Sequence, residues 1–566
     1  MKIIKILGRS FNLGFIKRLT KTVHDLPITE KVVFYIAITV LVISSLILLM
    51  NVNNNLQTKI PTHGGSLSEG IVGTPRFINP LLSISNADRD LTTLVYSGLL
   101  RPSNTGGYVN DLAKSYEVSP DGTIYTFKIK NDLKFQDGKP LTTKDIDFTI
   151  KMAQDSTLRS PKRVNWESVT VHVLSENEIQ FVLPEPFSPF LDNLTIGILP
   201  EHIWGNITSE QFQFSKFNTE PIGSGPYKVG RIKYDPGGLP VYYELSPFKD
   251  YALGRAYIDK LVIYLYQDNE SLVQAYNKNE VDSISGISKS DLDNIDISEH
   301  KLNKTPLPRV FGVFFNQNES PVLLNKEVRQ ALNTSLDRNY ITSEVFGELA
   351  MPESTPIPFS GSVSETNIDR ARSILEDAGW ELEDGVFNKK DERLSFSIST
   401  TNTDDLEKTA ELVAKDWREL GADVSVKIFE RNDLNQNVIR PRDFETLLFG
   451  QITGRNTELY SFWHSSQRVD PGLNISQYTN ITVDKLVEDV RVVSDTTVRD
   501  DLASSFIQEV SNDIPAVFIY SPYFTYILPE KVEHEPFGNI TLPSDRFNDI
   551  YSWYIYTQKV WKVFVD

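Results

Sequence analysis

The longest apolar run of the chain lies near its N-terminus. The 19 residues from 32 to 50 include no charged side chain, and a helix of that length crosses the hydrocarbon core of a bilayer. The run is longer than the core of a cleaved signal peptide, and no small-x-small cleavage site follows Met50. The pattern therefore predicts an uncleaved transmembrane anchor over 32–50, with a buried core helix as the alternative.

The residues on either side of this run predict its orientation. Basic residues precede it at Lys2, Lys5, Arg9, Lys17, Arg18, Lys21 and Lys31. Because segments rich in positive charge stay in the cytoplasm, residues 1–31 are expected to be cytoplasmic. The rest of this single-pass chain would then be extracytoplasmic, in the periplasm or at the cell surface. Residues 51–65 are polar, with three consecutive asparagines and two glycines, and predict a flexible stalk.

Further along, the hydrophobic period switches between two and about 3.6, which predicts strands alternating with helices. Tyr125, Phe127 and Ile129 alternate with polar residues and predict a half-buried strand after the turn at 121–122. Thr142 with Asp145 three residues later has the pattern of a capping box. The helix that begins there is expected to bury Ile146, Thr149, Ile150 and Ala153.

A second helix is predicted by apolar residues at helical spacing over 406–417. Gly421 suits the left-handed residue just past a helix end, and the alternation over 424–428 predicts a strand. Residues 328–335 and 368–378 predict two more helices, the latter followed by Gly379. The order helix, glycine, strand indicates an α/β layer, and the 566 residues have room for about three domains.

The charge balance argues against a general nucleic-acid binder. The chain has 57 Lys and Arg against 75 Asp and Glu, a net charge of −18. Residues up to 64 carry a surplus of six positive charges, which leaves −24 for the rest. Such a body lacks the cationic surplus that neutralises phosphates, so we expect no nucleic-acid partner. Cysteine is absent, which excludes disulfides, thiolate metal sites and a lipid anchor on cysteine.

Patterns typical of catalysis are weak. The seven histidines are scattered, with no pair spaced for zinc on one helix face, so we expect no metal and no cofactor. Ser246 and Lys249 match a Ser-x-x-Lys spacing, but its companion motifs are missing. Residues 223–225, Gly-Ser-Gly, are interpreted as a tight turn that allows close backbone approach. A hydrolase or another surface enzyme stays a minor alternative.

Several short motifs, each weak alone, follow one another in a fixed order along about 450 residues. They are residues 73–81, 96–99, 111–122, 125–127, 135–148, 223–227, 251–260, 315–316, 328–332, 337–338, 474–478 and 515–517. In this order they resemble the family 5 extracellular solute-binding proteins, the peptide-binding components of ABC importers. The stretch Phe-Gln-Asp-Gly-Lys-Pro-Leu-Thr over 135–142 is the most diagnostic of them.

The resemblance implies an α/β, two-lobed periplasmic-binding fold of type II in its large three-domain variant. Domain I would comprise residues 66–100, 219–305 and 512–566, domain II residues 101–218, and domain III residues 306–511. The chain would cross between the lobes at 305–309 and at 512–515. Both crossings contain a proline and would act as hinges.

The resemblance also implies a function. A protein of this kind captures peptides or similar solutes in the cleft between its lobes and delivers them to the permease subunits of an ABC transporter. It acts as a monomer and without catalysis. The alternative is a binding or sensor protein of the same fold whose solute is not a peptide, such as an oligosaccharide, a chelated metal or an anion.

One departure from the family bears on the ligand. In family members that bind the free α-amine of a peptide, an aspartate soon follows a Gly-Trp pair in domain III. Here Gln451 follows Gly450 in place of the tryptophan, and the loop continues with Thr453 and Arg455 instead of an aspartate. Arginine only donates hydrogen bonds, so Arg455 suits a carboxylate or another anion, while Glu458 would be the nearest acid to replace the aspartate.

The remaining candidates lie in family loops or at a predicted hinge. The full set of expected ligand-binding residues is Phe77, Asn79, Tyr227, Arg309, Gly450, Gln451, Thr453, Arg455, Glu458, Asn474 and Tyr478. Each of them also has a purely structural interpretation, since buried aromatic and amide side chains commonly stabilise a core.

Overall fold

The computed structural model describes residues 21–104, 106–361, 363, 365–455, 457–493, 495–538 and 540–564. It divides into two compact units, one built from the N-terminal residues to Thr62 with the C-terminal segment from Tyr556, the other from His63 to Ile555. The basic residues Lys2, Lys5, Arg9, Lys17 and Arg18 lie outside the described residues.

The smaller unit contains the predicted apolar helix. Helix α2 (Ile28–Leu56) is longer than predicted, and its segment Ile28–Asn53 is long and apolar enough to cross a membrane, with none of its most apolar window buried. Strand β1 (Gln57–Thr62) follows directly and pairs antiparallel with β23 (Tyr556–Trp561), after which a short turn, η8 (Lys562–Phe564), follows.

The expectation of a flexible stalk over 51–65 is therefore wrong for most of that segment. Helix α2 continues through residue 56, β1 occupies residues 57–62, and β2 begins at Ser66. The partner of β1 comes from the far end of the chain, so no local pattern in this polar segment indicates it.

The larger unit contains a 12-stranded sheet with the main order β20-β19-β21-β14-β22-β12-β2-β11-β10-β9. Its first half comprises β2 (Ser66–Val72), β9 (Tyr227–Tyr234), β10 (Pro240–Pro247), β11 (Lys260–Tyr266), β12 (Ser283–Ser285) and β13 (His300–Pro306). Its second half comprises β14 (Arg309–Phe315), β15 (Ala350–Pro352), β19 (Ser395–Thr401), β20 (Asp423–Phe429) and β21 (Thr446–Ile452). We call these halves, with their helices, the first and second lobes.

One long strand, β22 (Ala516–Pro529), joins the lobes. Its first residues pair with β14 and its last residues pair with β13 and β12. The outward crossing of the chain lies between β13 and β14, where it was expected. The return crossing lies inside β22, beyond the expected residues 512–515, because the chain continues as strand past Pro515.

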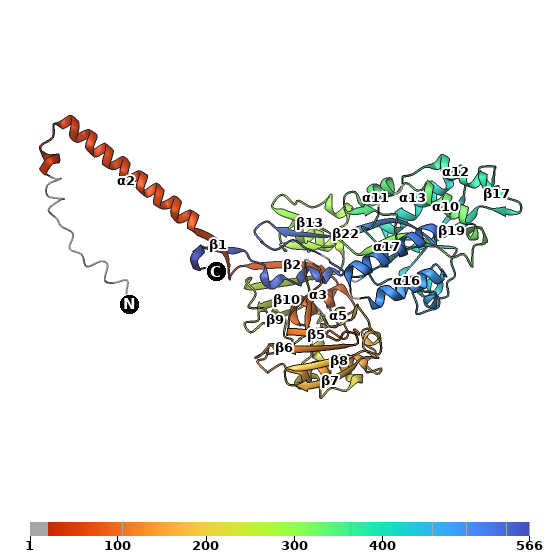
Figure 1. Ribbon diagram of the computed structural model, residues 1–566, viewed down its shortest axis with the longest axis horizontal. Coiled ribbons are helices and arrows are strands. Elements are labelled where there is room, and N and C mark those ends of the chain that lie inside the picture. The colour runs from red at the N-terminus through yellow and green to blue at the C-terminus, as the bar shows by residue number, and fades with distance from the viewer. Residues whose placement is uncertain are drawn as a thin grey trace. The chain divides into compact units, whose positions relative to one another are not determined.

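A second sheet belongs to the first lobe, and Figure 1 shows it below the β9–β10 end of the large sheet. Its order is β5-β6-β8-β7, with β5 (Ala113–Val118), β6 (Ile124–Ile129), β7 (Thr170–Ser175) and β8 (Glu178–Val182). Two short strands, β3 (Leu100–Pro102) and β4 (Tyr108–Asn110), precede it. In β6 the predicted residues Tyr125, Phe127 and Ile129 are buried, which confirms the alternating strand.

The first lobe contains several helices, some of which begin at a side-chain cap. They include α3 (Asn86–Val95), α4 (Thr143–Gln154), α5 (Phe190–Asn193), α6 (Glu201–Trp204), α7 (Ser209–Phe212), α8 (Asn269–Asn277) and α9 (Lys289–Leu292). The predicted capping box of Thr142 and Asp145 is present at α4, and all four residues expected on its inner face are buried.

The helices of the second lobe pack in two cores, one around Trp417 and one around Trp463, and both tryptophans are buried. These helices include α10 (Lys326–Ser335), α11 (Arg338–Phe346), α12 (Ile368–Asp377), α13 (Asp404–Leu420), α14 (Arg431–Asp433), α15 (Tyr460–Trp463), α16 (Ile481–Val492) and α17 (Thr496–Asp513). A small sheet, β16 (Glu381–Glu383), β17 (Val386–Lys389) and β18 (Glu392–Arg393), lies beside them. Gly421 ends α13 with φ of 118° and β20 follows, as predicted.

Candidate functional site

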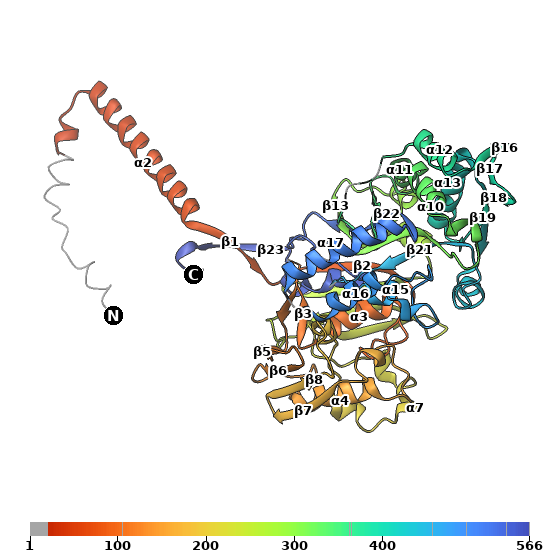
Figure 2. The same cartoon turned by 45° about the vertical axis from the view of Figure 1, so that its right-hand side comes forward.

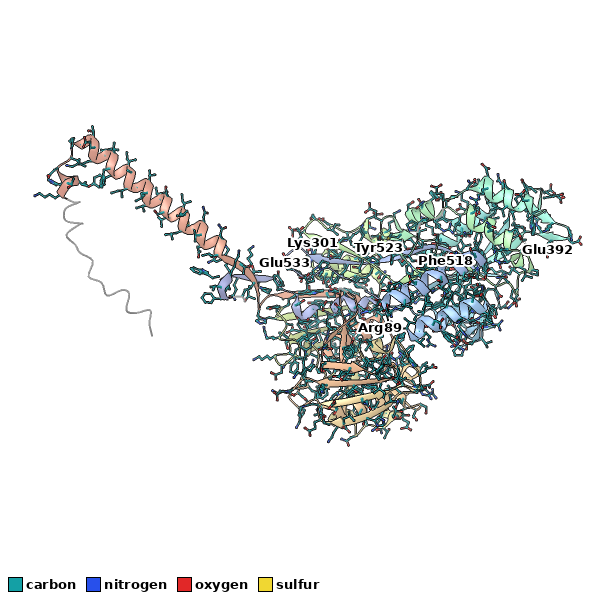
Figure 3. The ribbon with its side chains drawn as sticks, in the orientation of Figure 1. Arg89, Lys301, Glu392, Phe518, Tyr523 and Glu533 are labelled. Atoms are coloured by element: carbon teal, nitrogen blue, oxygen red, sulfur yellow. The ribbon has the colours of Figure 1, made fainter. Side chains whose placement is uncertain are left out.

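A pocket of about 390 Å³ opens where the two lobes meet at the strand crossings. Residues of the first lobe, of the crossing strands and of the second lobe all line it. They include Asn86, Asp90, Ser285, Ser288, Lys289, Leu307, Arg309, Phe346, Leu349, Asp405, Tyr523 and Thr525. We call this pocket the hinge pocket. Figure 3 labels Tyr523 and Phe518 along β22, the strand that forms part of its wall.

Hydrogen bonds fix the backbone at this crossing. The Ser521 hydroxyl in β22 donates to the carbonyl oxygens of Leu307, at 3.1 Å, and Arg309, at 2.7 Å. The amide of Thr453 and its hydroxyl both donate to the Pro308 carbonyl, at 2.9 and 3.1 Å. The segment before β14 is therefore attached to both of its neighbouring strands, and it holds the side chains of Leu307 and Arg309 at the pocket.

Two cations line the hinge pocket: Lys289, whose ammonium donates to the carbonyl oxygens of Ser343 and Glu344, and Arg309. Arg309 is the first residue of β14 and half-buried, and no hydrogen bond or ion pair joins its guanidinium to any of the described residues. Burial lowers the pKa of Arg309, although an arginine keeps its charge at any physiological pH. A partly buried cation without a partner raises the free energy of the protein, so an anionic group that enters the pocket would be stabilised there.

The hinge pocket also has an acidic side chain in its wall, Asp405. Asp405, in the first turn of α13, lines it from the second lobe, and Asp291 of the first lobe is near enough to interact. Partial burial, together with the charges of Asp404 and Asp291, raises the pKa of Asp405. A positively charged ligand group would relieve this repulsion, so the pocket offers separate places for an anion and for a cation.

A second pocket, of about 190 Å³, lies between α3, the residues that follow α4, and the turn η6 (Pro543–Phe547). Arg89 and Lys162 line it, and neither has an ion-pair partner within the described chain. Burial and the neighbouring charge of Arg89 lower the pKa of Lys162. Figure 3 labels Arg89 in this region. These two cations offer an anion two charged partners, in a pocket that Asp111, Asp192 and Asp545 also line.

The lobes touch across the cleft, which is therefore closed in this structure. Arg455 of the second lobe forms an ion pair of 2.8 Å with Asp545 of the first, and their side chains are 5% and 15% exposed. The amide of Ser188 donates to the carbonyl of Arg491 at 2.8 Å, and the Arg491 guanidinium lies 5.2 Å from the ring centre of Phe187.

Arg455 was expected to receive an anionic ligand, and the structure gives it another partner. The guanidinium of Arg455 donates a hydrogen bond to the carboxylate of Asp545. The same carboxylate accepts hydrogen bonds from the backbone amides of Thr541 and Leu542. Glu458, the expected substitute acid, pairs with Arg491 at 3.4 Å and accepts the amide of Tyr460. Both residues thus join parts of the protein near the lobe contacts.

The other candidates of the same loop stabilise the second lobe. Gln451 is fully buried, donates to the carbonyl of Pro356 and accepts the indole N–H of Trp463 at 3.1 Å. Gly450 lies under Phe311, whose ring would be 2.7 Å from a Cβ at this position. Gln451 therefore occupies an internal position that the family pattern gives to a tryptophan.

Asn474 and Tyr478 form part of an internal network. Asn474 is fully buried and bonds through its amide to the carbonyl and the backbone amide of Tyr478. The Tyr478 hydroxyl donates to Asp513 at 2.6 Å, and burial followed by this carboxylate raises the pKa of Tyr478. In the closed structure these side chains face the core of the second lobe rather than either pocket.

Three candidates of the first lobe also face its hydrophobic cores: Phe77, Asn79 and Tyr227. Asn79 is fully buried, donates to Asn218 at 3.1 Å and accepts the amide of Leu81. The Tyr227 hydroxyl donates to the Ile258 carbonyl at 3.0 Å, and Phe77 packs against the core beside it. Of the eleven expected residues, only Arg309 lines the hinge pocket.

Three residues that line the pockets, Arg89, Lys162 and Asp405, are not predicted from the sequence. Asp405 follows Asp404 at a predicted helix start, which is also where an acid stabilises the helix dipole. Arg89 and Lys162 are more than seventy residues apart in the sequence, and only the fold brings them to one pocket. No local spacing distinguishes them from the other basic residues of the chain.

Two lobes that close over a cleft at paired strand crossings define the class of solute-binding proteins. The chain belongs to the bacterial extracellular solute-binding proteins of family 5, whose model matches residues 107–472. This is a family of binding proteins, and the match confirms the resemblance seen in the motifs.

Individual relatives extend this similarity over most of the chain. The oligopeptide-binding protein AppA of Bacillus subtilis is 29% identical over 491 residues, covering 84% of this chain and 89% of AppA. The structure of AppA in complex with a nonapeptide matches with a TM-score of 0.68 and 26% identity, over 88% of this chain and 100% of AppA. The structure of the ABC transporter substrate-binding protein CtaP of Listeria monocytogenes matches with a TM-score of 0.75 and 26% identity, over 87% of this chain and 100% of CtaP. The nickel-binding periplasmic protein of Escherichia coli is 25% identical, covering 79% and 86%.

Proposed function

We propose that this protein is the membrane-tethered receptor of an ABC importer, which captures short peptides between its lobes and delivers them to the permease. Membership of family 5 and the similarity to the oligopeptide-binding protein AppA support the transport class. The observation that carries the choice of ligand is the hinge pocket, where Arg309 without a partner and the acid Asp405 line one cavity.

A zwitterionic peptide matches these charges. Its carboxylate would bind the Arg309 guanidinium, since an arginine can bind a carboxylate with two parallel hydrogen bonds. Its ammonium would lie toward Asp405 and Asp291, where a positive charge offsets the repulsion between carboxylates. The volume of about 390 Å³ falls within the range typical of small-ligand sites and suits a short peptide.

The tether is α2. Its apolar segment Ile28–Asn53 has no buried residues in its most apolar window, so it is not a core helix of this fold. With basic residues before it in the sequence, residues 1–31 would be cytoplasmic and the lobes extracytoplasmic. The protein would act as a monomer and without catalysis, and an N-terminus cleaved after residue 50 in the mature protein would contradict the tether.

Native mass spectrometry of the full chain in detergent micelles tests the ligand. We expect co-purified short peptides on the wild type and their loss in Arg309→Gln, which removes the charge but keeps a polar side chain. Arg431→Gln is the matched control, because Arg431 is exposed at the start of α14 and lines neither pocket. Peptides that stay bound to Arg309→Gln with unchanged affinity would overturn the assignment of Arg309.

The second pocket favours one alternative, an anionic solute such as a metal chelate with free carboxylates. There Arg89 and Lys162 would hold the anion together. A thermal-shift series with citrate tests this alternative: stabilisation that disappears in Arg89→Gln/Lys162→Gln and persists in Arg309→Gln would favour the anion over the peptide. Stabilisation by peptides alone would exclude it.

A further inference from the structure

The C-terminal strand returns to the point where α2 ends. In the β1–β23 ladder Gln57 pairs with Trp561, and Thr62 at the other end pairs with Tyr556. Leu56, the last residue of α2, precedes Gln57 directly, so Trp561 lies beside the helix end. Figures 1 and 2 both show the C-terminus at this end of the ribbon. Because β23 runs antiparallel to β1, residues after Trp561 continue toward the helix.

One face of this ribbon is basic and aromatic. Side chains alternate between the faces of a strand, and directly paired residues share a face. Gln57 with Trp561 and Lys59 with Lys559 are two such pairs on one face. Like charges placed opposite each other destabilise a ladder in water, and both lysines are exposed. Residues 57–62 and 556–564 include no Asp or Glu to offset them.

Large apolar side chains are exposed at the same place. Trp561 is 46% exposed, Val563 72% and Phe564 77%, and Lys562 lies between them in the sequence. Tryptophan is enriched at the boundary between lipid and water, and lysines near a membrane surface attract anionic headgroups. A two-stranded ribbon is at best marginally stable in water, so this ribbon needs a further surface to cover it.

The distances fit the interface of a bilayer. From Met50, the last residue of the apolar run, to Leu56 the helix rises about 9 Å, at about 1.5 Å per residue. The turn η8 continues back from Trp561 for three residues, or about 6 Å at the rise of a 3₁₀ helix. Phe564 would then reach the headgroup region, which is several ångströms thick on each side of the hydrocarbon.

We propose that the ribbon face of Lys59, Lys559 and Trp561, extended by Val563 and Phe564, docks on the headgroups of the membrane that α2 crosses. The partner is a lipid surface with anionic headgroups, and the docking is a second, interfacial anchor at the C-terminus. This inference rests on the proposed membrane tether. The excess of positive charge on the ribbon contrasts with the net acidic lobes, so the ribbon is the part suited to an anionic surface.

Tryptophan fluorescence can test this contact selectively. Six of the seven tryptophans are less than 2% exposed, and Trp561 is the seventh. We would reconstitute the full chain into vesicles of phosphatidylcholine and phosphatidylglycerol whose acyl chains carry bromine, a quencher of tryptophan. We expect quenching in the wild type and its loss in Trp561→Phe. A bimane label on Val563→Cys, in a chain without other cysteines, should shift to the blue on the same vesicles without bromine.

A pair of charge variants tests the electrostatic part. Lys559→Glu/Lys562→Glu should reduce the bromine quenching several-fold on vesicles with phosphatidylglycerol. Lys326→Glu/Lys485→Glu makes the same change of net charge at exposed lysines of the second lobe and should leave the quenching unchanged.

The two proposals fail differently in this experiment. A chain that does not float with the vesicles would overturn both the tether and the docking. The docking alone would be overturned by a chain that floats with the vesicles but shows neither quenching of Trp561 nor a blue shift of the bimane emission. Equal quenching in both charge variants would overturn the role of the lysines.

Discussion

At the scale of single residues, Arg455 and Asp545 connect ligand binding to the closed form. The two side chains come from different lobes, so their ion pair of 2.8 Å breaks when the lobes separate. Because both side chains are largely buried in the closed form, removing one of them would leave the other charge desolvated and without this partner there. In the open form both charges are hydrated, so the pair stabilises closure and not the fold of either lobe.

We therefore expect Arg455→Ala to weaken peptide binding about tenfold or more, which is about 1.4 kcal/mol, without lowering the melting temperature of the empty protein. Isothermal titration calorimetry with a bound peptide identified by mass spectrometry measures the change. Arg431→Ala should bind normally. A double-mutant cycle compares the changes in binding free energy of Arg455→Ala, Asp545→Ala and the double variant. If the two single changes simply add, the pair is not coupled and this role is wrong.

Glu353 gives a prediction about pH. It follows β15, is 3% exposed and accepts the amide of Phe359 at 2.9 Å. Burial raises the pKa of Glu353 from 4.5 to about 7. Between these two values the folded protein binds a proton that the unfolded chain does not, so stability falls as the pH rises from about 4.5 to 7.

Above pH 7 this single carboxylate costs about 3 kcal/mol, from 1.36 kcal/mol per pKa unit. Glu353→Gln should therefore raise the free energy of unfolding by up to that amount at pH 8 and change it little at pH 4. Denaturant melts at both pH values measure the difference, with the exposed Glu383→Gln as the control. An equal effect of Glu353→Gln at both pH values would refute the raised pKa.

Individual side chains of the candidate site were only partly predictable from the sequence. Asn79, Gln451 and Asn474, three candidates from the motifs, are buried and bonded internally. A polar residue in a family loop has the same sequence signal whether it faces a ligand or satisfies a backbone group. Burial decides between these roles, and burial depends on contacts across the fold.

At the scale of elements, the turn Gly223-Ser224-Gly225 was interpreted as a place of close backbone approach, and the structure confirms this. The amide of Gly225 donates to the Val95 carbonyl at 2.7 Å, and a Cβ on Gly225 would lie 2.6 Å from the Val95 carbonyl carbon. The turn thereby fixes the C-terminal end of α3, the helix that carries Arg89 to the second pocket.

Gly225→Ala should therefore destabilise the protein by about 1–3 kcal/mol, the usual cost of overpacking, since backbone atoms have little freedom to move aside. Gly230→Ala in β9 is the matched control, because the nearest atom to its Cβ would be at 3.4 Å. Chemical denaturation of both variants measures the costs. Equal stability of the two would show that the turn is looser than described.

Elements with local signals were predictable, and elements with distant partners were not. Helix α4 has its capping box in four consecutive residues, and α13 ends at a glycine that permits the left-handed conformation. In contrast, β1 is polar and pairs with a strand at the other end of the chain. The return crossing inside β22 was missed for a similar reason, since its position depends on strands from both lobes.

At the scale of the whole molecule, ligand binding should change the distance between the lobes. The chain has no cysteine, so Lys128→Cys in β6 and Glu392→Cys in β18 can be labelled as a unique pair of exposed positions. Electron–electron double resonance on the full chain should show one shorter distance with peptide and a broader, longer distribution without it.

The control is a pair of labels at Glu392 and Lys427, both exposed in the second lobe, whose distance should not change. The Arg455→Ala background should shift the peptide-free distribution further toward long distances. An unchanged distance between the lobes in all conditions would mean that the ligand enters without closure.

The pairing of β1 with β23 also has a consequence for biogenesis. During synthesis β1 leaves the ribosome early, while its partner strand is made hundreds of residues later. The two lobes lie between these strands in the sequence, so under the proposed topology they can fold first as the chain emerges on the far side of the membrane. The ribbon therefore assembles only after both lobes have been synthesised.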